Sequence, residues 1–76
     1  LMQQQYREAI EAYRLVEGLD PGGAFSDDAL IQAGKSYEQL GRTPEAGLCY
    51  GTLLGRHATS PHAKEARQRL ASLSQN

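Results

Sequence analysis

Two histidines and one cysteine are the first side chains to consider as metal ligands or nucleophiles in this sequence. His57 and His62 stand on either side of Ser60-Pro61 and are five residues apart. Two metal ligands on one helix face need a spacing of about four residues, and no third ligand stands nearby. Cys49 has no flanking base that would activate it as a nucleophile, so we expect a buried, small hydrophobic residue. We therefore expect no metal, no cofactor and no enzymatic activity.

Composition and charge narrow the classes of partner. The chain has 76 residues, of which 39% are hydrophobic, and a formal net charge of −1. A module that binds nucleic acid or an anionic membrane surface is usually more basic. No run approaches the roughly 18 apolar residues that a membrane span needs. We therefore expect one domain over residues 1–76, with no nucleic-acid partner and no membrane insertion.

The sequence repeats itself at an offset of 37 positions. In each copy an alanine is followed four residues later by a tyrosine, which puts a small and a large side chain on one helix face. Such a face suits the close approach of a second helix. The offset pairs Glu8 with Glu45, Ala9 with Ala46, Tyr13 with Tyr50, Gly18 with Gly55, and Ala29 with Ala66.

A helix of a second kind is predicted between the two copies. Apolar residues recur there at spacings of three and four, with polar residues turned away from them. The stripe consists of Leu30, Ala33, Gly34, Tyr37 and Leu40, and a similar stripe of Ala63, Ala66, Leu70 and Leu73 follows Pro61. Gly34 costs about 1 kcal/mol relative to alanine in a helix interior, so it indicates that another helix passes close by.

Start and stop signals divide the chain into helices near residues 3–18, 26–40, 44–57 and 61–74. Ser26 is expected to cap the second helix with its hydroxyl. Pro44 and Pro61 suit first helical positions, and Gly41 suits a C-terminal stop. No segment alternates with period two, so we expect no strands and an all-α fold.

These features resemble the tetratricopeptide repeat (TPR) family. The family pattern of a bulky residue, a small residue with glycine, and tyrosine on one helix, then alanine and an aromatic residue on the next, reads here as Leu30, Ala33-Gly34, Tyr37, Ala46 and Tyr50. The likeness covers the second helix of one repeat, one complete repeat and a final solvent-capping helix. The Ser60-Pro61 turn and its surroundings are similar to the C-terminal repeats of bacterial envelope TPR proteins, such as the Tol-Pal-associated periplasmic protein and outer-membrane-assembly lipoproteins.

The resemblance implies antiparallel helical hairpins that serve as a non-catalytic protein–protein interaction scaffold. The family typically binds a partner peptide or helix on the concave wall formed by the first helix of each repeat. Here those helices are residues 26–40 and 61–74, and Ile31 is expected to be an exposed apolar anchor among polar neighbours. The expected partner-binding residues are Asp28, Ile31, Gln32, Lys35, Glu38, Glu65 and Arg69. Gln32 and Glu65 stand where a carboxylate-clamp TPR would need asparagine and a cation, so that activity is not expected.

The helix near residues 3–18 has the pattern of a second helix without its own first partner. Its apolar face contains Tyr6, Ala9, Ile10, Tyr13 and Val16. Repeat units usually need about three copies to bury a continuous core. We expect this face to be covered by upstream sequence in a larger bacterial protein, of which this chain is a C-terminal part, and by self-association or a partner when the chain is isolated. The alternative function is therefore a structural module that caps or dimerises a helical solenoid. The resemblance leaves the periplasm and the cytoplasm open and favours the periplasm.

Overall fold

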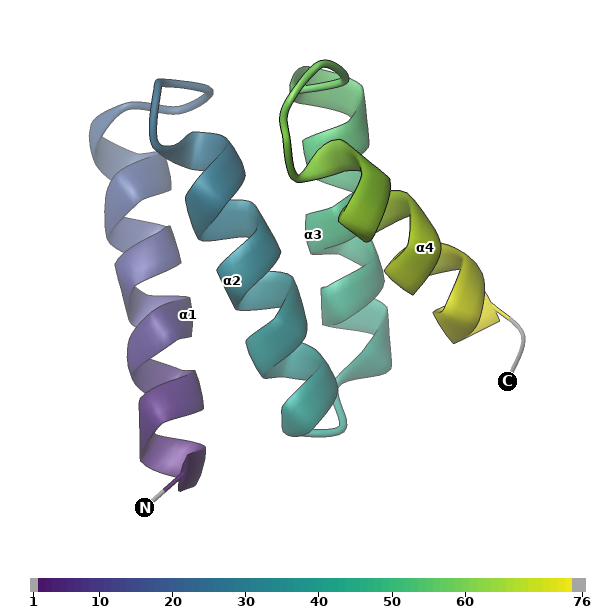
Figure 1. Cartoon of the computed structure of the whole chain (residues 1–76). Coiled ribbons are helices and arrows are strands. Elements are labelled where there is room, and N and C mark those ends of the chain that lie inside the picture. Colours follow the sequence, from purple (N-terminus) through teal and green to yellow (C-terminus); the bar gives the residue numbers. More distant parts are fainter. Residues whose placement is uncertain (1, 75–76) are drawn as a thin grey trace.

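The computed structural model describes residues 2–74, so residues 1, 75 and 76 of the expected domain lie outside it. Four α-helices follow one another in antiparallel order: α1 (Met2–Leu19), α2 (Ser26–Gln39), α3 (Thr43–Arg56) and α4 (Ala63–Ser74) (Figure 1). No strand occurs between residues 2 and 74. The all-α prediction is confirmed, and each helix boundary agrees with the predicted one within two residues.

The helices pack as neighbours in chain order, so that α2 lies between α1 and α3, and α4 packs on α3 (Figure 1). A close contact joins α2 to α3, where the fully buried ring of Tyr50 lies over Gly34. A Cβ atom on Gly34 would stand 2.4 Å from the Cε1 atom of that ring. The expected close passage of a helix beside Gly34 is therefore confirmed, and Ala46 is fully buried as well.

The predicted turn residues act largely as expected. Gly41 has a φ of 76°, a left-handed conformation that favours glycine, and it ends α2. Pro44 stands in the first turn of α3, where its missing N–H costs no hydrogen bond. Pro61 is the exception: α4 begins at Ala63, because residues 60–63 form a turn in which the N–H of Ala63 donates to the carbonyl of Ser60 over 3.0 Å.

The predicted capping role of Ser26 is wrong. Phe25 occupies the N-cap position of α2, without a side-chain cap. Ser26 instead lies inside the helix, fully buried, and its hydroxyl donates to the Oε1 atom of Glu17 on α1 over 2.9 Å. The same Glu17 carboxylate accepts from Arg56 on α3 over 3.1 Å. A buried hydroxyl needs a hydrogen-bond partner, and the nearby carboxylate supplies it.

None of the helices within residues 2–74 combines the length and the apolar character needed to cross a bilayer.

Candidate functional site

Four of the predicted partner-binding residues form an ion-pair network between α2 and α4. Lys35 Nζ lies 3.1 Å from Glu65 Oε2, and Arg69 Nε lies 3.0 Å from the same oxygen. Arg69 also reaches back to α2, where one of its terminal nitrogens lies 3.2 Å from Glu38 Oε2. The structure therefore brings Lys35, Glu38, Glu65 and Arg69 together, and their charges are largely compensated within the chain.

The network extends into the core through Tyr50. The hydroxyl of Tyr50 donates a hydrogen bond to Glu38. Burial of this side chain, together with its hydrogen bond to the Glu38 carboxylate, raises the pKa of Tyr50 well above its ordinary value. On the outer side, hydrogen bonds from Arg69 and then Lys35 lower the pKa of Glu65. The network thus links the exposed α2–α4 surface to the buried α2–α3 contact.

Asp28 and Gln32 complete the polar part of the predicted set. The Oδ1 atom of Asp28 lies 2.9 Å from Nε2 of His62, which joins the start of α2 to the residue before α4. Gln32 is exposed on α2. The backbone N–H of His57 caps α3 by donating to the carbonyl of Leu53 over 2.7 Å.

The prediction that Ile31 is an exposed anchor is wrong. Its side chain is 1% exposed and belongs to the hydrophobic core. The reason is the central position of α2, which packs against α1 on one side and α3 on the other. A helix with two neighbours buries a wider arc than the single stripe expected from the sequence, and Ile31 and Ser36 lie in the additional part of that arc.

A hollow of about 440 Å³, lined by polar and apolar surface in similar amounts, lies beside the network. We call it the glutamine hollow, because three exposed glutamines stand at its edge. It includes three of the predicted partner-binding residues, Gln32, Lys35 and Arg69. Its full lining is Gln5, Tyr6, Ala9, Gln32, Lys35, Ser36, Gln39 and Arg69. Glutamine amides both donate and accept hydrogen bonds, so this surface can pair with the N–H and C=O groups of a peptide.

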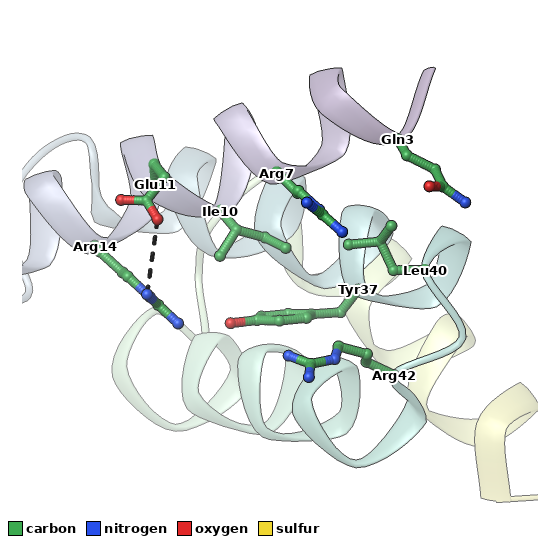
Figure 2. A pocket seen from close by; sticks show the side chains of 8 residues that line it. All are labelled: Gln3, Arg7, Ile10, Glu11, Arg14, Tyr37, Leu40 and Arg42. Carbon is green, nitrogen blue, oxygen red and sulfur yellow. Dashed lines mark ion pairs between the residues drawn. The ribbon is translucent and has the colours of Figure 1, made fainter. Parts of the chain in front are cut away.

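A second pocket, of about 460 Å³, was not anticipated from the sequence. Figure 2 shows Tyr37 lying across it, with Arg7 and Arg14 reaching in from α1 and Arg42 from the turn after α2. Ile10 and Leu40 provide apolar surface. Guanidinium groups over an apolar floor can bind a carboxylate or phosphate group.

The acidic neighbours of this pocket hold its arginines only loosely. Arg14 lies 3.7 Å from Glu11, an ion pair marked by the dashed line in Figure 2, and both side chains are well exposed. Arg42 lies 3.8 Å from Glu45. A signal in the sequence was available: Arg7, Ile10, Glu11 and Arg14 recur at spacings of three, four and seven and so share one helix face.

The predicted uncovered face of the first helix is only partly uncovered. Ile10 is 7% exposed and packs into the core, so its inclusion in that face is wrong. Tyr6, Ala9, Tyr13 and Val16 are half-buried. Three of these four line an apolar groove of about 400 Å³ between α1 and α2.

Cys49 is buried, as predicted, and burial raises its pKa to about 11. At neutral pH such a thiol is almost entirely protonated, which makes it a poor nucleophile.

No family model, no curated protein and no solved structure matches this chain.

Proposed function

We propose that this chain is a non-catalytic protein–protein interaction module of the TPR type, which binds an extended segment of a partner in the glutamine hollow. The observation that carries the proposal is the gathering of Gln5, Gln32 and Gln39 around one hollow, next to the paired ends of Lys35 and Arg69. The two cations are already compensated by Glu65 and Glu38.

The charge state of the hollow favours a peptide backbone over a charged ligand. Because the cations have partners within the chain, a charged ligand would have to displace them and would gain little. The three amides keep unused donors and acceptors of both kinds, which complement a peptide chain. The α2–α4 ion pairs also fix the two helices beside the hollow, so that little ordering is needed on binding.

A displayed library of random peptides, selected against the intact chain, tests this proposal. Selected peptides should lose binding when Gln32 and Gln39 are both replaced by alanine, since these exposed side chains support binding and not the fold. Gln4→Ala is the matched control, because Gln4 is equally exposed on α1 but does not line the hollow. Equal binding by all three proteins, or a library that yields no binder, would contradict the proposal.

A structural role is the second candidate. It is favoured by the ion-pair network, in which Lys35, Glu38, Glu65 and Arg69 satisfy one another and leave few charges for a partner. In that case the chain would cap or dimerise a helical array. Analytical ultracentrifugation distinguishes the two candidates: a concentration-dependent dimer that is unaffected by the Gln32→Ala, Gln39→Ala double change supports the structural role.

A further inference from the structure

The apolar groove between α1 and α2 repeats a surface that is already occupied elsewhere in the molecule. Five of its lining residues, moved by the 37-residue offset, fall on five buried residues of α3 and α4. The groove residues are Ala9, Ala12, Tyr13, Val16 and Ala29, and their counterparts are Ala46, Cys49, Tyr50, Leu53 and Ala66. The counterparts are at most 5% exposed, whereas each groove residue is half-buried or exposed.

The helix α2 covers the surface that these counterparts form on α3 and α4. Its Gly34 receives the ring of Tyr50, and Glu38, four residues later, accepts from the Tyr50 hydroxyl and pairs with Arg69. At the same offset, Tyr13 of the α1–α2 groove corresponds to Tyr50, and Gln32 corresponds to Arg69. A helix in this groove would meet the same ring and a comparable donor.

We propose that the α1–α2 groove binds a partner helix with the chemistry of α2. Such a helix carries glycine where it crosses Tyr13, an apolar stripe on either side of that glycine, and a carboxylate four residues later. The glycine leaves room for the ring. The carboxylate accepts from the Tyr13 hydroxyl and from the Gln32 amide. Partial burial already raises the pKa of Tyr13, and a hydroxyl that is fully covered needs such an acceptor.

The described helices of a second copy do not offer such a helix, since no glycine of α1 or α3 is followed four residues later by a carboxylate. Its α2 is enclosed between α1 and α3, and α2 could leave only if the fold opened. The exposed side of α4 carries Lys64, Arg67 and Gln68, which would place charge and amide groups on the alanines of the groove. The occupant is therefore a different helix. It uses a surface that shares no residue with the Arg7–Arg42 pocket and shares Ala9 and Gln32 with the glutamine hollow.

A synthetic peptide with the sequence of residues 26–40 is the probe. A lactam between Asp28 and a Gln32→Lys change makes it helical, and circular dichroism verifies this before use, because a free helix of this length is marginal in water. Titrated into the intact chain labelled with ¹⁵N, it should bind with a stoichiometry of one and shift the amide signals of Ala9, Ala12, Tyr13, Val16 and Ala29.

Two peptide variants and two protein variants test the chemistry. Gly34→Leu in the peptide should weaken binding by at least about tenfold, because the new side chain meets the Tyr13 ring. Glu38→Ala in the peptide should weaken it several-fold. Ala12→Glu in the protein should abolish binding, whereas Ala71→Glu should leave it unchanged. Both alanines are exposed on helices, so neither change disturbs the core.

Three results would overturn the proposal. The first is no binding by the verified helical peptide. The second is equal binding by the Gly34→Leu peptide, which would mean that the ring of Tyr13 does not select the partner. The third is a chain that sediments as a dimer and becomes monomeric on Ala12→Glu, which would make a second copy the occupant. Failure of the peptide library on the glutamine hollow would leave these outcomes unaffected, because Ala12 does not line that hollow.

Discussion

The contact between Gly34 and Tyr50 makes a quantitative prediction about the α2–α3 interface. In most exposed helix positions, glycine to alanine stabilises a protein by about 1 kcal/mol. At Gly34 the added methyl group would stand 2.4 Å from Cε1, 2.8 Å from Cζ and 2.9 Å from Cδ1 of the Tyr50 ring. That ring is fully buried and anchored at its hydroxyl by Glu38, so it has little room to move.

The expected effect is the balance of two terms. Overpacking a core costs about 1–3 kcal/mol, and the close approach to a fully buried ring puts Gly34→Ala in the upper part of that range, about 2–3 kcal/mol, against a gain of about 1 kcal/mol in helix propensity. We therefore expect Gly34→Ala to lower the free energy of unfolding by about 1–2 kcal/mol. For a domain of this size, each kcal/mol shifts Tm by about 4–8 °C, so Tm should fall by about 4–16 °C.

Thermal and urea unfolding, followed by circular dichroism at 222 nm, measures this change. Gly51→Ala is the control, because Gly51 lies within α3 and a Cβ there would meet nothing within 4 Å. It should raise Tm by about 4–8 °C. In a Tyr50→Leu background, where the ring is absent, Gly34→Ala should become neutral or stabilising. If Gly34→Ala raises Tm as Gly51→Ala does, the proposed packing of α2 on α3 is wrong.

Three further predictions concern titration, reactivity and the core hydrogen bond. Hydrogen bonds, the largest from Arg69, hold the folded pKa of Glu65 below its ordinary value of 4.5, so this carboxylate stabilises the fold above that pH and the contribution is lost as the pH falls. The stability difference between the native chain and Glu65→Gln should therefore be constant from pH 5 to 8 and shrink below about pH 4.5, measured by urea unfolding. With its pKa raised from 9.0 to about 11, Cys49 should react with a disulfide reagent at pH 8 at least about a hundredfold more slowly in the folded chain than in denaturant. Tyr50→Phe should lower the free energy of unfolding by about 1 kcal/mol, because Glu38 loses a donor while the packing is kept.

Each of these predictions has a result that would contradict it. Parallel stability profiles of the native chain and Glu65→Gln down to pH 3 would show that Arg69 and Lys35 do not hold this carboxylate. Equal labelling rates for folded and denatured chain would place Cys49 at the surface. A Tyr50→Phe variant as stable as the native chain would mean that the hydrogen bond from Tyr50 to Glu38 makes no net contribution to the free energy of unfolding.

The helices and their closest contact were predictable because local chemistry decides them. Gly41 and Pro44 act through their own backbone geometry, and the spacing of Leu30, Gly34 and Tyr37 specifies a buried face whatever lies opposite. These signals depend on neighbours in the sequence alone.

The errors lie where a neighbour in space decides the outcome. Ile31 has the polar residues Asp28 and Lys35 as neighbours along its side of the helix, and the packing of both α1 and α3 on α2 buries it. Ser26 looks like a cap, but Phe25 takes the N-cap position of α2, so Ser26 lies inside the helix and its hydroxyl donates to the Glu17 carboxylate across the α1–α2 interface. The charges of α2 and α4 were predicted as partner-binding residues, and their pairing with one another was not foreseen, because it depends on the approach of the two helices.

The Glu17 carboxylate links three helices, and this affects how α1 unfolds. One carboxylate on α1 accepts from Ser26 on α2 and from Arg56 on α3, and the Ser26 hydroxyl is fully buried. If the C-terminal end of α1 unfolded, the Ser26 hydroxyl would lose its acceptor and the Arg56 guanidinium would lose its ion pair in the same step. Local unfolding of α1 is therefore coupled to α2 and α3. The helix α1 therefore opens together with α2 and α3, as one cooperative unit.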